Sequence, residues 1–130
     1  MDILSSWMPN VIKNAALFPD AIMVTLIMLV VTGVISFVIG LPLAVLVVIT
    51  KPDGILPNKP VFWILDKIIN LFRAIPFVIL IPMTFVLTRM IFHTTVGIKC
   101  AFVPLIIGTV PFVARQLESA MEEIPEGIIE

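Results

Sequence analysis

The sequence has few of the residues from which active sites and soluble surfaces are built. Only 13% of its 130 residues are charged, and it has one cysteine, one histidine and no tyrosine. A soluble domain usually has about 25% charged residues. The lone Cys100 excludes an internal disulfide and a cysteine metal cluster, and His93 alone leaves little material for acid–base or zinc chemistry. The net charge of −1 excludes a polybasic nucleic-acid-binding protein.

Apolar residues are abundant instead. They make up 60% of the chain, and the mean hydropathy is +1.19. A water-soluble fold this small could not hide so much apolar surface, because small domains bury the smallest fraction of their chain. The composition therefore predicts an all-α integral membrane protein whose partner along most of its length is the lipid bilayer.

The first predicted crossing, about residues 21–49, contains no charged residue. It exceeds the roughly 20 residues that span the hydrocarbon core. A secretory signal is excluded because the apolar run is too long and the preceding segment, residues 1–20, has no basic start. We therefore expect residues 1–20 to form an outer N-terminal segment, followed by a transmembrane region over residues 21–114.

Two further crossings are predicted at about residues 68–92 and 95–114. Each reaches the required length only if a basic residue near its start, Arg73 or Lys99, extends to the headgroups. The first connector, Thr50–Pro60, is rich in proline and contains an Asp-Gly turn signal. We interpret Arg73, Lys99, Arg89 and Arg115 as interfacial anchors rather than ligands.

The distribution of basic residues predicts the orientation, because cytoplasmic loops carry more Lys and Arg. One side of the membrane holds Lys51, Lys59, Lys67, Arg73 and Arg115, and the other holds Lys13, Arg89 and Lys99. The sequence therefore places the N-terminus outside and the C-terminal tail in the cytoplasm of a multi-pass protein.

Small residues and prolines suggest how the crossings pack. Thr25, Thr32, Ser36 and Gly40 share one helix face, with Gly33 beside it, and such a stripe lets helix backbones approach closely. Each membrane proline removes a backbone hydrogen bond, so we expect kinked helices, although a purely structural kink explains any single one. The prolines are Pro42, Pro76, Pro82, Pro104 and Pro111.

The tail, residues 115–130, has a helical pattern of its own. Leu117, Ala120, Met121 and Ile124 recur at helical spacing, with Glu118, Glu122 and other polar residues on the remaining surface. This pattern fits either a solvated helix or a docking surface for a soluble partner. No acidic residue lies between Asp66 and Glu118, so transport coupled to protons or sodium through intramembrane carboxylates is not expected.

With these residues identified, the sequence resembles the membrane permease of binding-protein-dependent ABC importers, and most of all the methionine-import permease. The resemblance lies in four collinear segments that cover most of residues 21–130. They are Gly40–Leu46 (GLPLAVL), Ile69–Phe77 (INLFRAIPF), Val103–Arg115 (VPLIIGTVPFVAR) and Glu118–Glu130.

The resemblance implies a helical subunit of the bacterial inner membrane that acts as a homodimer. Two cytoplasmic ATPase subunits would bind the ATP, and an extracytoplasmic binding protein would deliver the amino acid. Glu130 matches the first Glu of the family's Glu-Ala-Ala coupling helix, which contacts the ATPase. We therefore expect the N-terminal portion of a truncated permease. The chain has no phosphate-binding loop and is not expected to be an enzyme or to hold a cofactor or metal itself.

Two alternatives stay open. Within the same class, the chain could come from a permease for polar amino acids, because no substrate-binding residue can be identified from the sequence. In another class, three crossings and a small-residue face suffice for a self-contained oligomeric membrane protein.

Overall fold

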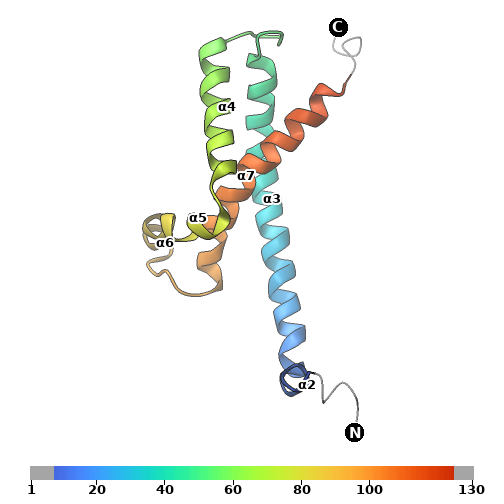
Figure 1. Ribbon diagram of the computed structural model, residues 1–130, viewed down its shortest axis with the longest axis vertical. Helices are drawn as coiled ribbons and strands as arrows, with labels where there is room; N and C mark the ends of the chain where they lie inside the picture. The colour runs from blue at the N-terminus through green and yellow to red at the C-terminus, as the bar shows by residue number, and fades with distance from the viewer. Residues whose placement is uncertain (1–7, 125–130) are drawn as a thin grey trace. The chain divides into compact units, whose positions relative to one another are not determined.

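The computed structural model describes residues 8–124, and the regular elements in this range are all helices (Figure 1). They are α2 (Pro9–Lys13), the 3₁₀ helix η1 (Ala15–Leu17), α3 (Phe18–Thr50), α4 (Lys59–Ala74), α5 (Phe77–Met83), α6 (Phe85–Phe92) and α7 (Ile98–Glu122). Contacts divide the chain into two units, residues 1–31 and 32–130.

The first unit contains α2, η1 and the beginning of α3. Pro9 opens α2, where its missing N–H costs no helical hydrogen bond. None of the described residues 8–31 is buried. The Thr25 hydroxyl donates a hydrogen bond to the Ala21 carbonyl at 2.8 Å, which satisfies this polar group within its own helix.

Helix α3 contains the whole first predicted crossing and extends past both of its ends. With η1 it forms one of the two helices in the described part of the chain that are long and apolar enough to cross a membrane, the other being α7. Only 11% of its most apolar window is buried, unlike the core helix of a soluble protein. An all-round apolar, exposed helix is stable in lipid, which agrees with the composition.

The turn that follows α3 directs the chain back along it. A Cβ on Gly54 would lie 2.6 Å from the Val48 and Ile49 carbonyl oxygens, so only glycine fits at this position. The Leu56 amide donates to the Ile49 carbonyl at 2.9 Å. The Asn58 side chain then accepts from the Val61 amide at 3.2 Å, which caps the N-terminus of α4.

The second predicted crossing, about residues 68–92, is not one helix. Helix α4 begins earlier and ends at Ala74, because Ile75 precedes a proline and adopts an extended conformation (φ −77°, ψ 120°). Pro76 then caps α5, and Thr84 separates α5 from α6. None of these three helices reaches the length of a membrane crossing. Where the sequence predicted one kinked helix, the structure has three separate ones, and the segment keeps its apolar character.

Most of the third predicted crossing, from Ile98 onward, and the first part of the predicted tail form one helix, α7. Pro104 and Pro111 lie inside it without ending it. Helix α7 contacts α4, α5 and α6, and it meets α3 and α4 in a core of Val47, Ile69 and Ala114. Figure 1 shows α4 beside the C-terminal part of α3, with α7 crossing both.

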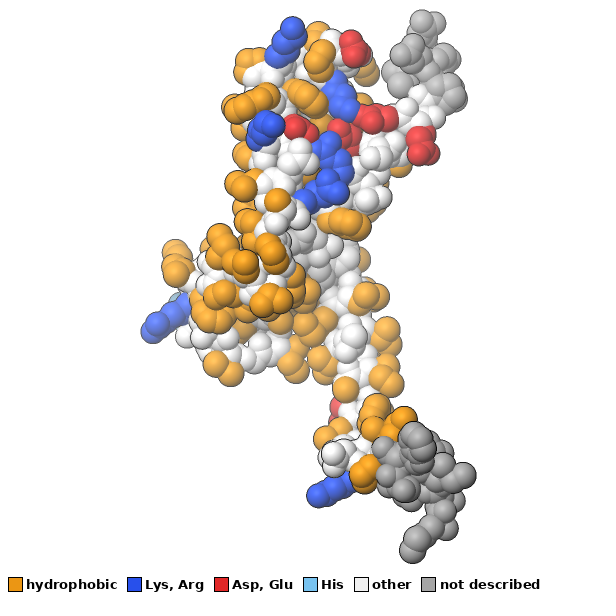
Figure 2. Space-filling model, viewed as in Figure 1, with side chains coloured by type: hydrophobic (Ala, Val, Ile, Leu, Met, Phe, Trp, Pro, Cys, Tyr) orange, Lys and Arg blue, Asp and Glu red, His pale blue; other side chains and the backbone are white. Residues whose placement is uncertain are grey.

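Figure 2 shows where charge lies on the second unit. Charged side chains gather at the end that holds the α3–α4 turn, over α3, α4 and α7, and the surface around α5 and α6 is mostly apolar. This distribution fits a protein whose charged end lies at the membrane surface and whose apolar part lies within the bilayer.

Candidate functional site

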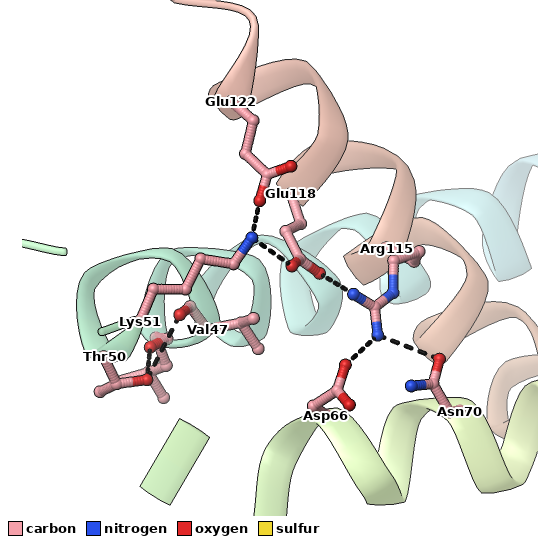
Figure 3. Close-up of polar contacts among 9 residues, drawn as sticks. Val47, Thr50, Lys51, Asp66, Asn70, Arg115, Glu118 and Glu122 are labelled. Atoms are coloured by element: carbon pink, nitrogen blue, oxygen red, sulfur yellow. Dashed lines mark hydrogen bonds and ion pairs between the residues drawn. The ribbon is translucent and has the colours of Figure 1, made fainter. Parts of the chain in front are cut away.

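Three helices bring an ion-pair cluster together at the charged end of the second unit (Figure 3). Its members are Lys51 after α3, Asp66 and Asn70 on α4, and Arg115, Glu118 and Glu122 on α7.

Arg115 lies at the centre of the cluster and connects α7 to α4. Its Nη1 donates to Glu118 Oε2 at 2.7 Å, and its Nη2 donates to Asp66 Oδ1 at 2.5 Å and to Asn70 Oδ1 at 3.0 Å. The hydrogen bond from Arg115 holds the pKa of Asp66 below its usual value of 3.8, against the opposing effect of burial. Asp66 is therefore ionised near neutral pH, and the pair is a charged one.

Glu118 connects the same arginine to the end of α3. Lys51 Nζ lies 3.1 Å from Glu118 Oε1 and also pairs with Glu122. Glu118 is only 2% exposed, so its charge is removed from solvent and compensated by two cations. A buried carboxylate compensated in this way disfavours other packings of these helices, since they would leave its charge without a partner.

The sequence-based interpretation of this region needs two corrections. Arg115 was expected to be an interfacial anchor, and its contacts with Asp66, Asn70 and Glu118 make it a link between helices. Glu118 was expected on the solvated face of the tail helix and is buried, whereas Ala120 and Ile124 of the expected apolar stripe are exposed. Helical periodicity alone could not predict these contacts, because the partners of Arg115 on α4 are remote in sequence.

The expected small-residue face of α3 partly meets α7. Thr32, Ser36 and Gly40 are buried, and a Cβ on Gly40 would lie 3.0 Å from Val113 Cγ1 and 3.3 Å from the Ala114 nitrogen. The Thr32 and Ser36 hydroxyls have no hydrogen-bond partner among the described residues. Gly33 is exposed, and a Cβ there would meet nothing within 4 Å in the described structure, so it does not take part in this contact.

The prolines take two kinds of position. Pro42 lies inside α3, and Pro104 and Pro111, both buried, lie inside α7. Pro76 separates α4 from α5, and Pro82 lies inside α5 directly before its last residue, Met83. Glu130, the expected first residue of the coupling helix, lies outside the described residues.

A cavity of about 620 Å³ opens where α4 breaks off and α5 begins. Its wall combines polar residues, Asn70, Arg73 and Thr109, with the aromatic rings of Phe72, Phe77 and Phe112. A second cavity of about 290 Å³, between α3, α4 and α7, is lined by apolar residues alone. Neither cavity could be predicted from the sequence, because each is formed by helices far apart in the chain.

Metal binding and cysteine or histidine chemistry have little support in the described residues. They contain no group of three or more His, Cys, Asp or Glu side chains placed to hold a metal ion. Cys100 is buried, in keeping with a small apolar role. His93 ends α6 in the left-handed conformation with φ 58°.

Comparison with known proteins identifies relatives of one kind, although no family model matches the chain. The D-methionine transport system permease protein MetI of Yersinia pestis is 44% identical over 106 residues, which cover 82% of this chain and 49% of the relative. The protein of the same name from Escherichia coli K12 is 45% identical over the same coverage. A probable MetI of Vibrio cholerae is 39% identical over 117 residues, or 90% of this chain.

The fold agrees with these relatives. A solved structure of the MetNI methionine ABC transporter in inward-facing conformations matches with a TM-score of 0.84 and 39% identity, over 99% of this chain and 56% of the matched one. The chain spans about half the length of the curated relatives it matches. The resemblance to the permeases of binding-protein-dependent ABC importers is therefore confirmed in both sequence and fold, for a chain about half as long as those permeases.

Proposed function

We propose that this chain forms the membrane-spanning permease part of an ATP-driven importer of methionine. The observation that carries the proposal is the TM-score of 0.84, at 39% identity, with the permease of a methionine ABC transporter. The relatives named as D-methionine permeases support the same substrate. A permease for polar amino acids remains the alternative within the class.

The proposal includes partners that the chain needs for transport. A second permease copy, cytoplasmic ATPase subunits and an extracytoplasmic binding protein would complete the importer in the bacterial inner membrane. The excess of basic residues on one side supports an outside N-terminus and a cytoplasmic C-terminal end for α7. Transport then requires ATP binding to favour one arrangement of the two permease copies over the other.

The ion-pair cluster suits the mechanical part of this function. Arg115 and Glu118 join α7 to both α3 and α4, so a displacement at the C-terminal end of α7 would move the three helices together. In the proposed orientation this end faces the ATPase subunits. The cluster would therefore transmit a displacement of α7, caused by the ATPase subunits, to α3 and α4.

A chimera tests the proposal. Residues 21–124 replace the aligned segment of the Escherichia coli relative in a strain that lacks that permease but keeps its ATPase and binding protein. We expect uptake of labelled methionine well above the strain's background, and loss of that uptake when the ATPase gene is also deleted. Uptake of a polar amino acid in place of methionine would favour the alternative substrate class.

Expression of residues 1–130 alone provides the comparison. We expect this chain to insert into the membrane but to leave methionine uptake at background, because these residues correspond to only about half the length of the relatives named as permeases. ATP-dependent accumulation by the chain alone would refute that expectation.

A further inference from the structure

We infer that the cavity at the α4–α5 break is a binding site for a zwitterionic amino acid with an apolar side chain, and that Arg73 binds its carboxylate. The inference rests on the proposed function, since it assigns the substrate's place within the permease. It follows from three features of the cavity, which together match the three parts of such an amino acid.

The first feature is a pair of hydrogen-bond donors. Arg73 lines the cavity, and its guanidinium has no hydrogen bond or ion pair within residues 8–124. Asn70 also lines it, and its amide oxygen is occupied by Arg115 at 3.0 Å (Figure 3). Because arginine only donates, this contact leaves the Asn70 NH₂ group as the free end of the amide. Two donors, one of them cationic, favour a carboxylate.

The second feature is the end of α4. The last carbonyls of a helix have no partner within the helix and carry partial negative charge. Pro76 has no N–H to offer them, and no loop or side-chain hydrogen bond reaches the carbonyls of residues 71–74 within the described structure. Three residues of this last turn, Phe72, Arg73 and Ala74, line the cavity. These acceptors suit the α-ammonium group.

The third feature is the remaining wall. Phe72, Phe77 and Phe112 contribute aromatic rings, and sulfur makes favourable contacts with such rings. A volume of about 620 Å³ lies within the range of about 300–1,000 Å³ typical of small-molecule sites. Gly108 also lines the cavity, and a Cβ there would occupy part of the space and lie 3.1 Å from Leu80 Cδ2.

The other cavity does not offer this combination. Its lining is apolar throughout, so it gives neither a donor for a carboxylate nor an acceptor for an ammonium group. The two cavities therefore differ in whether their walls carry polar groups, and a thiol placed on the wall of the first cavity reports on that cavity alone.

The test measures protection of an engineered cysteine in the chain reconstituted in lipid nanodiscs. Cys100→Ala removes the one native cysteine, and Ala74→Cys places a thiol on the cavity wall. We expect L-methionine to slow alkylation of this thiol by a maleimide. Methionine methyl ester, which lacks the carboxylate, should need about a tenfold higher concentration for the same protection, the typical effect of one charge-assisted hydrogen bond.

Matched variants separate binding from folding. Ala120→Cys, on an exposed part of α7 outside the cavity, should react at a rate that methionine does not change. Arg73→Gln should raise the concentration for half-protection about tenfold, and Arg73→Lys should raise it less. Arg89→Gln removes the same charge from α6 and should have no effect. An Ala120→Cys rate that is unaltered by Arg73→Gln shows that the variant has kept its fold.

Three results would overturn the inference. Ala74→Cys could react at the same rate with and without methionine, or the methyl ester could protect it as well as methionine does. It could also be unreactive before methionine is added, which would show that lipid or a second copy fills the cavity. Any of these with uptake intact in the chimera would leave the proposed function standing. Protection by methionine without uptake in the chimera would reject the function and keep the site.

Discussion

Glu118 is the single side chain that links α7 both to the end of α3 and, through Arg115, to α4. It is a charged residue that is only 2% exposed, and it contacts Lys51 on one side and Arg115 on the other. Loss of Glu118 would leave Arg115 Nη1 without its acceptor and would remove one of the two carboxylates that contact Lys51, although Asp66 and Glu122 would still pair with these two cations.

We therefore expect Glu118→Ala to lower the free energy of unfolding by about 1–3 kcal/mol, the cost of a buried donor that loses its acceptor. Glu118→Gln should lose less, since the amide oxygen can still accept a hydrogen bond. The measurement is SDS-induced unfolding in detergent micelles, followed by circular dichroism. The control is Glu123→Ala, which removes the same charge from an exposed position on the adjacent turn. Equal stability of the two alanine variants would show that the cluster contributes nothing.

At the level of single residues the sequence could predict the kinds of side chain present but not their pairing. The expected anchor role of Arg115 and exposed position of Glu118 followed from one helix considered alone. Asp66 and Arg115 are 49 positions apart, and only the packing of α4 against α7 brings them together.

At the scale of helices, α3 and α7 approach closely at one glycine. Gly40 lies against Val113 and the Ala114 backbone, whereas Gly33, on the same helix, faces open space in the described structure. Small residues at such contacts let membrane helices pack through their backbones.

The two glycines give a matched test of this contact. Gly40→Leu should lower the free energy of unfolding by about 1–3 kcal/mol, the usual cost of overpacking, because the new side chain would collide with α7. Gly33→Leu should be neutral or slightly stabilising, since leucine favours a helix more than glycine does. The same unfolding experiment in micelles measures both. A larger loss for Gly33→Leu would contradict the assignment of the contact face.

Prolines explain which helices could be predicted and which could not. The proline at 76 ends α4 because the residue before it cannot remain helical, whereas those at 104 and 111 are accommodated within α7. The hydropathy of the two segments is similar, so it does not distinguish the proline that ends a helix from the prolines that lie within one. Whether a membrane proline breaks a helix or is tolerated depends on the groups that satisfy the freed carbonyl, and those belong to neighbouring elements.

For the whole molecule, the number of crossings decides on which sides of the membrane the termini lie. Within residues 8–124 two helices are long and apolar enough to cross, and between them lies the apolar but broken segment α4–α6. Three crossings remain our prediction, with α5 and α6 completing the second crossing as a discontinuous helix.

Reporter fusions test this directly. We expect alkaline phosphatase to be active when fused before residue 1 and inactive when fused after residue 130, with the opposite result for a fluorescent protein that folds only in the cytoplasm. The reason is that an odd number of crossings places the termini on opposite sides. Fusions that report the same side for both ends would show that α4–α6 turns back within the membrane.

The sequence by itself determined that the protein belongs in a bilayer, that its elements are helices, and that its motifs resemble those of ABC importer permeases. These properties follow from composition, run length and local order, which need no knowledge of neighbours. Only the tertiary structure decided where α4 ends, that Glu118 is buried between two cations, and that Arg73 lines a cavity. Each of these depends on groups far apart in the chain, and their proximity is a property of packing rather than of local sequence.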